Sequence, residues 1–255
     1  MEVGARTPEQ IDPIETAKEK EIEVVFGHLS GAAARIYRIG KKARIRVSDK
    51  IVTEGRRRRA IMHEVGHYVL GHALPEEDDL LSCFHVSCKR RNPKEERDAD
   101  IVAIEHLTPE PMVQPYCLTK PVDLEAVRPI ERVFRASPVM SAMRFVELSP
   151  EACAVAYSYE GRVVWMKPSR TFPTHLDKGA VLSAESVAGS FFAGGTLADA
   201  PRTRAASSWF PQSKRVAPTE DLVEHAAIIP EPGWGGVLSM LWLPGAKQSV
   251  YSSRL

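Results

Sequence analysis

The chain has 255 residues, which is enough for one sizeable hydrophobic core or for two or three smaller ones. Apolar residues make up 44% and charged residues 26%, so the composition is that of an ordinary globular protein and excludes global disorder. The net charge of +1 gives no overall preference for nucleic acid or for a membrane. Binding to either would therefore need a local patch.

The amino terminus and the cysteine content indicate a reducing compartment. Met1 to Thr7 contains no apolar segment of the kind that a secretory signal needs, and no run of about 18 apolar residues predicts a membrane-spanning helix. Four cysteines are too few for a disulfide scaffold in a chain of this length. We therefore expect a cytoplasmic protein with free thiols and no membrane partner.

The first half of the chain predicts a helix, three strands and two longer helices. Asp12 is a candidate N-cap, and Pro13 follows it at the first helical position. Gly40-Lys41-Lys42 is a candidate three-residue hairpin loop between the second and third strands. The expected ranges are 13–20 (helix), 21–26, 33–39 and 43–47 (strands), and 57–71 and 93–107 (helices).

Closely spaced prolines from Pro109 to Pro121 mark a boundary in the chain. Beyond it we expect two short helices within 123–148 and a hairpin whose turn is Glu160-Gly161. An apolar strand is expected over 237–243.

The segment His63-Glu64-Val65-Gly66-His67 lies on the strongest predicted helix. Two histidines four residues apart lie one turn apart on the same side of a helix, so both imidazoles can bind one ion. Glu64 is placed to act on a water at that ion without being a ligand. The motif indicates metal-assisted hydrolysis. The alternative is a chance pattern of surface histidines that bind no metal.

A hydrolytic zinc site needs a third protein ligand and an open fourth position. The helix expected over 93–107 offers five acidic candidates: Glu95, Glu96, Asp98, Asp100 and Glu105. We choose Glu96 as the ligand, because Asp100 follows on the same face and can accept a hydrogen bond from a ligand histidine.

Several other residues have two interpretations. His72 could polarise a bound carbonyl, or could be a favourable charge at a helix carboxyl end. Tyr116 could stabilise an oxyanion if its loop folds over the site. Cys83, His85 and Cys88 could form a second metal site or a redox control of the zinc, or could be inert. The run 56–59, all arginine, could hold an acidic substrate segment, but a solvated basic face is the simpler interpretation.

The order of these segments resembles the ImmA/IrrE family of metallopeptidases over residues 13–110. The resemblance rests on the arginine-containing approach at 57–62, the motif at 63–67, and Glu96-Arg97-Asp98-Ala99-Asp100 in a helix that ends before Pro109. The chain departs from the family where Val102 replaces a usual phenylalanine and where 105–108 replaces a run of leucines and a methionine.

The resemblance implies an α+β fold in which a small antiparallel sheet packs on the pair of metal-binding helices. It implies three parts: a zinc metallopeptidase-like domain (1–115), a helix-turn-helix-like unit (116–150) and a GAF-like regulatory domain (151–255). It also implies cleavage of a helix-turn-helix (XRE-type) repressor, which would derepress stress or mobile-element genes.

The resulting hypothesis is a zinc endopeptidase that holds one zinc ion with His63, His67 and Glu96. Glu64 is its general base, and the strand 43–47 is a candidate edge for an extended substrate. Two alternatives stay open. One is a zinc-dependent DNA-binding regulator, for which Arg132, Arg135 and Arg144 are a thin basic footprint. The other is a sensor with a structural zinc site, although such a site has no use for Glu64. The sequence indicates no oligomeric state.

Overall fold

The structure is a computed structural model in which residues 7–77, 92–229 and 235–246 are described. The chain forms two compact units that alternate along the sequence. Unit 1 comprises Met1–Met112 and Ile130–Ser137, and unit 2 comprises Val113–Pro129 and Pro138–Leu255. The expected division at residues 115 and 150 stays a prediction.

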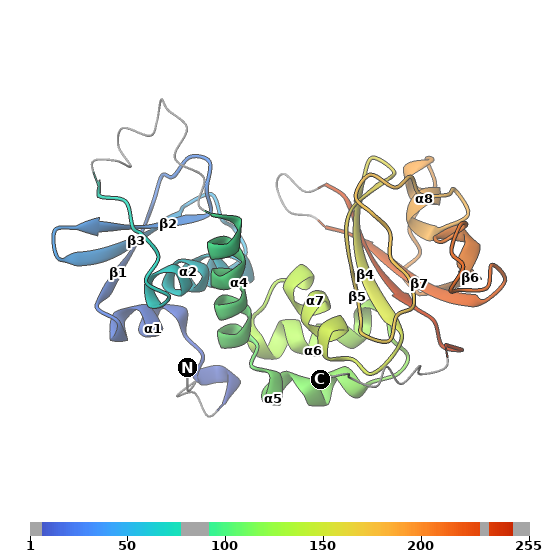
Figure 1. Cartoon of the computed structure of the whole chain (residues 1–255), viewed down its shortest axis with the longest axis horizontal. Coiled ribbons are helices and arrows are strands. Elements are labelled where there is room, and N and C mark those ends of the chain that lie inside the picture. Colours follow the sequence, from blue (N-terminus) through green and yellow to red (C-terminus); the bar gives the residue numbers. More distant parts are fainter. Residues whose placement is uncertain (1–6, 78–91, 230–234, 247–255) are drawn as a thin grey trace. The chain divides into compact units, whose positions relative to one another are not determined.

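Unit 1 is a three-stranded sheet with helices (Figure 1). Its elements are η1 (Pro8–Gln10), α1 (Pro13–Glu19), β1 (Ile22–Gly27), β2 (Ala34–Ile39), β3 (Lys42–Ser48), α2 (Glu54–Val69), α4 (Pro93–Leu107) and the end of α6 (Leu124–Phe134). The predicted helix start at Pro13 is confirmed: the Asp12 side chain accepts hydrogen bonds from the amides of Ile14 and Glu15. Helix α2 begins three residues before the predicted start at Arg57.

The small sheet has the order β1-β3-β2, which corrects two expectations. The hairpin β2–β3 is antiparallel, but β1 runs parallel to β3, so the sheet is mixed rather than purely antiparallel. The chain reverses between β1 and β2 and again between β2 and β3, so β3 runs in the same direction as β1. Strand β1 pairs with the side of β3 that β2 does not occupy. The strand expected to be an edge is therefore central, and β2 is the edge strand beside α2.

The turn between β2 and β3 is also tighter than predicted. Ile39 pairs with Lys42, which leaves Gly40 and Lys41 as a two-residue connection. Gly40 has a φ of 61°, a conformation that glycine adopts without steric cost.

Helices α2 and α4 pack closely because small residues meet at their contact. A Cβ on Gly66 would lie only 2.9 Å from the carbonyl oxygen of Ala99. The start of α2 is equally crowded, since a Cβ on Gly55 would lie 2.4 Å from the amide nitrogen of Ser137. The two glycines thus fix how close α4 and the segment 130–137 come to α2.

Unit 2 is built on a five-stranded antiparallel sheet of order β5-β4-β8-β7-β6. Its elements are η2 (Gln114–Leu118), the start of α6, α7 (Pro138–Leu148), β4 (Cys153–Tyr159), β5 (Arg162–Pro168), α8 (Val187–Phe192), β6 (Arg202–Ala205), η3 (Ala206–Ser208), β7 (Asp221–Ile228) and β8 (Val237–Trp242). The short helix α5 (Glu110–Val113) lies at the junction of the units.

The predicted hairpin of unit 2 is confirmed. Glu160 and Gly161 both have positive φ, 49° and 73°, as the favoured two-residue hairpin turns require. The sequence did not predict β6, β7 or α8. The α+β class is confirmed for both units, and no helix among the described residues is long and apolar enough to cross a membrane.

Candidate metal centre

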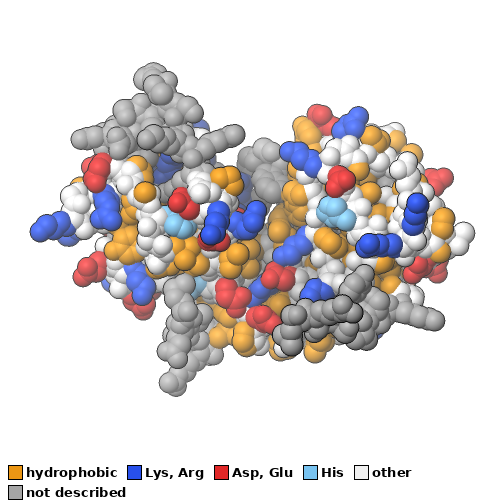
Figure 2. Space-filling view, viewed as in Figure 1, with side chains coloured by type: hydrophobic (Ala, Val, Ile, Leu, Met, Phe, Trp, Pro, Cys, Tyr) orange, Lys and Arg blue, Asp and Glu red, His pale blue; other side chains and the backbone are white. Residues whose placement is uncertain are grey.

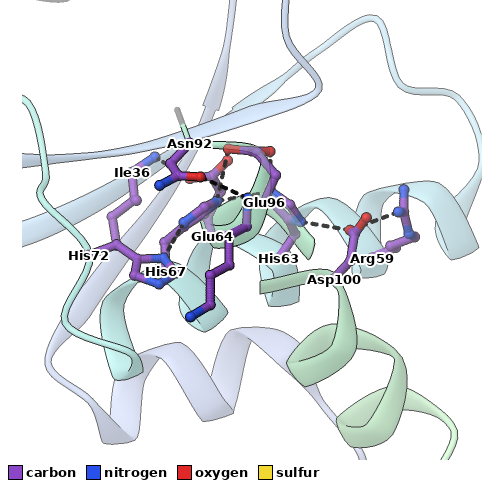
Figure 3. A network of polar contacts seen from close by, with 10 residues as sticks. Ile36, Arg59, His63, Glu64, His67, His72, Asn92, Glu96 and Asp100 are labelled. Carbon is purple, nitrogen blue, oxygen red and sulfur yellow. Dashed lines mark hydrogen bonds and ion pairs between the residues drawn. The ribbon is translucent and has the colours of Figure 1, made fainter. Parts of the chain in front are cut away.

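Three predicted ligands converge in unit 1, two from α2 and one from α4 (Figure 3). The Nε2 atoms of His63 and His67 are 3.0 Å apart. The carboxylate of Glu96 lies 3.2 Å from Nε2 of His63 and 3.4 Å from Nε2 of His67. Among the described residues, these three form the cluster that could hold a metal ion.

The distances fit a tetrahedral zinc site. Zinc bonds of about 2.0–2.1 Å to nitrogen and oxygen separate the ligand atoms by about 3.3–3.4 Å. The two Nε2 atoms are 3.0 Å apart, and Glu96 places Oε2 3.2 Å from Nε2 of His63 and Oε1 3.4 Å from Nε2 of His67, so its carboxylate lies within reach of an ion between the two rings. His67 is fully buried, whereas the Glu96 side chain is 44% exposed. The site is thus closed on the His67 side and accessible beside Glu96.

Each ligand histidine has a partner on its other ring nitrogen. Nδ1 of His63 lies 2.8 Å from Oδ1 of Asp100, and Nδ1 of His67 lies 2.8 Å from Nδ1 of His72. A proton on each ligand Nδ1, donated to these partners, leaves both Nε2 lone pairs for a metal. Asp100 was predicted in this role.

The electrostatics favour a proton on Nδ1 of His63. Burial lowers the pKa of His63, but its hydrogen bond with Asp100 and the charges of Glu64, Asp100 and Glu96 outweigh burial and raise that pKa. Burial raises the pKa of Asp100, but the His63 hydrogen bond and the Arg59 charge lower it further, below its ordinary value. Asp100 is therefore ionised at neutral pH and accepts the Nδ1 proton of His63.

Glu64 is held beside the ligand cluster by the edge strand. Glu64 is 5% exposed, and its carboxylate accepts a hydrogen bond of 2.9 Å from the backbone amide of Ile36 on β2. The Ile36 amide was missed from the sequence, because a backbone group leaves no signature in the residue type. Had β2 been identified as the edge strand, its outward-facing backbone amides would have been candidates for this contact.

The arginine run forms a solvated basic face only in part, because three of its side chains have partners in unit 1 and Arg58 is buried. Arg57 lies over the ring of Phe26, 5.8 Å from its centroid. Arg58 is 6% exposed and donates to the carbonyl of Ile11 at 2.6 Å. Arg59 forms an ion pair of 2.8 Å with Asp100. These three side chains serve the fold and the metal centre, because the helix turns each one toward a different neighbour.

The remaining candidates lie behind the cluster, in unit 2 or outside the described residues. His72 adjoins the Nδ1 side of His67, away from the Nε2 atoms that face Glu96. Tyr116 lies on η2 in unit 2, and its role stays a prediction. Cys83, His85 and Cys88 lie outside the described residues.

Comparison with known proteins identifies the family. The profile of the M78 peptidases, described as the IrrE N-terminal-like domain, matches residues 17–146, just over half of the chain. The chain belongs to the M78 peptidase (IrrE N-terminal-like) family. This assignment supports a metallopeptidase at a general level and implies a bound metal, and the cluster of His63, His67 and Glu96 lies within the matched range.

A solved structure extends the similarity of fold to both units of this M78 family member. A transcriptional regulator from Mycobacterium tuberculosis is 16% identical, with a TM-score of 0.60. The match covers 95% of this chain and 73% of the regulator. At this identity the similarity concerns the fold alone. No curated protein matches the chain.

Proposed function

We propose that this protein is a cytoplasmic zinc endopeptidase that cleaves a helix-turn-helix repressor of the XRE type and so derepresses stress or mobile-element genes. The observation that carries the peptidase assignment is the position of Glu64. This acidic side chain lies beside the cluster of His63, His67 and Glu96 and also accepts a hydrogen bond from the edge of a sheet. A structural zinc site needs neither feature.

The roles of the residues follow from their geometry. His63, His67 and Glu96 would hold the ion, which when bound would polarise the scissile carbonyl and lower the pKa of the attacking water. The Ile36 amide orients the carboxylate of Glu64, which would take the proton of that water and pass it to the leaving amine. Asp100 and His72 orient the two histidines.

The edge of β2 is the proposed docking place for an extended substrate. The amides of Ile36 and Arg38 both point away from β3, toward Glu64 and the carbonyl of Pro75 respectively. Because alternate residues of an edge strand share this direction, Ala34 also presents its backbone groups there. A substrate strand added between Ala34 and Ile36 would bring its peptide bond beside Glu64.

The test combines metal content with cleavage. Wild type, Glu64→Gln and Glu96→Ala are each incubated with a repressor encoded beside this gene, and bound zinc is measured for all three. Glu64→Gln is expected to keep zinc and lose cleavage, and Glu96→Ala to lose both. Glu95→Gln is the matched control, since Glu95 lies next to Glu96 on α4 but outside the ligand cluster. Undiminished cleavage by Glu64→Gln would refute the mechanism.

The alternative of a DNA-binding regulator is weakened by the contacts of its predicted arginines. Arg144 is 3% exposed and pairs with Glu147 at 3.2 Å. Arg135 donates to the carbonyl of Ile11 and pairs with Glu54. Acidic and basic side chains are also mixed over the described surface visible in Figure 2. A salt-dependent gel shift with the intact chain tests this alternative directly.

Residues 151–255, the larger part of unit 2, are proposed to form a GAF-like regulatory domain, preceded by a helix-turn-helix-like unit at 116–150 that contains α6 and α7. An antiparallel sheet that contacts α7 through β4 and β5 and α8 through β7 supports the first assignment. The fold similarity to a transcriptional regulator supports a role in gene regulation.

A further inference from the structure

Unit 2 contains a pocket that the proposed peptidase does not use. It lies between α8 and the edge strand β6, which are neighbours at one end of the large sheet (Figure 1), and has a volume of about 380 Å³. Its lining residues are Val187, Ser190, Thr196, Ala198, Arg202 and Arg204. This volume is in the range of pockets that hold small organic molecules.

The pocket carries two positive charges on one wall. Arg202 and Arg204 are two residues apart on β6, so their side chains project from the same face of the strand. Within the described part of the chain, Arg204 donates to the carbonyl of Thr203 and neither arginine forms an ion pair. Both guanidinium groups are therefore able to bind an anion.

The carboxylate that lies opposite Arg202 on the neighbouring strand is engaged elsewhere. Glu224 pairs with Arg202 in the register of β6 and β7, and its side chain is buried. Its oxygens accept hydrogen bonds from the amides of Val187 and Ala188, at 2.7 and 2.9 Å, from Nε1 of Trp209 at 2.8 Å and from the hydroxyl of Ser239 at 3.3 Å. Glu224 thus holds α8 against the sheet, and within the described residues it forms no ion pair with Arg202.

We propose that this pocket binds a small organic anion, a phosphate ester or a carboxylate. The two arginines would form charge-assisted hydrogen bonds with the acidic group. Ser190 and Thr196 add hydroxyl donors, and Val187 and Ala198 provide an apolar surface for the carbon skeleton. The proposal is independent of the peptidase activity, because all of these residues belong to unit 2.

Calorimetric titration of the intact chain tests the proposal. The probes are butyl phosphate and glutarate, with butanol and glutaramide as uncharged counterparts and sulfate as a bare anion. We expect one of the two organic anions to bind more tightly than its uncharged counterpart and than sulfate, and which one binds distinguishes a phosphate ester from a carboxylate. The double variant Arg202→Gln/Arg204→Gln should weaken that binding at least about tenfold.

Lys214→Gln/Arg215→Gln is the matched control, because it removes two exposed positive charges from the same unit outside the pocket. It should change the affinity less than about threefold. All four side chains are exposed, so the variants should fold, which circular dichroism checks. The proposal is overturned if neither organic anion exceeds sulfate and its uncharged counterpart, or if the control variant loses as much affinity as the pocket variant.

Discussion

Nδ1 of His63 lies 2.8 Å from Oδ1 of Asp100, and the same carboxylate oxygen lies 2.8 Å from the guanidinium of Arg59. A carboxylate in this position fixes the ring orientation and tautomer of a metal ligand. Asp100→Asn is therefore expected to raise the zinc dissociation constant about 10- to 100-fold, as measured by competition with a chelating dye. Arg59→Gln is the comparison: its side chain is 45% exposed, so the effect should stay below about fivefold.

The second histidine ligand gives a parallel test with a conservative rescue. His72→Ala removes the acceptor for Nδ1 of His67 and should weaken zinc binding about tenfold. His72→Asn places an amide oxygen near the same position and should keep the affinity within about threefold. Equal losses in the two variants would show that His72 does not act through this hydrogen bond.

Gly66→Ala tests whether the closeness of α2 and α4 builds the site. Alanine normally favours a helix by about 1 kcal/mol over glycine. Here the added Cβ would lie 2.9 Å from the backbone oxygen of Ala99, so we expect a net loss of about 1–3 kcal/mol in the free energy of unfolding. Denaturant titration measures this change, and zinc affinity should fall with it, because Glu96 is carried by the displaced helix.

Gly27→Ala is the control for that variant, since a Cβ on Gly27 meets no heavy atom within 4 Å. Its free energy of unfolding should stay within about 0.5 kcal/mol of wild type. An equally small change in the free energy of unfolding for Gly66→Ala would mean that α2 and α4 can move apart without loss of stability.

The buried thiols of unit 2 should be inert. Burial raises the pKa of Cys117 and Cys153 to about 12, and both side chains are fully buried. At pH 8 the thiolate fraction of each is then on the order of 10⁻⁴. Iodoacetamide labelling followed by peptide mapping should leave both cysteines unmodified in the native protein and modify both in denaturant. Rapid native labelling of either residue would contradict this burial.

The cluster of candidate ligands was predictable because its signals are local. The four-residue spacing of His63 and His67, and the helix bounds Pro93–Leu107 that carry Glu96, follow from helical periodicity and proline placement. The identity of the edge strand was not predictable, because it depends on which hairpin strand β1 joins. Strand β7 was hidden by Glu224, an acidic residue at an inward position whose donors come from distant segments.

The segment 130–137 has a consequence for how this fold can be divided. Arg135 donates to the carbonyl of Ile11, and the backbone at Ala136 and Ser137 fills the space above Gly55. A chain truncated after Met112 would expose the first turn of α2 and lose this support. Unit 1 is therefore not a continuous stretch of the sequence, because it includes residues 130–137. A fusion protein that contains only residues 1–112 would lack part of this unit. The family match agrees, since it continues to residue 146, past this returning segment.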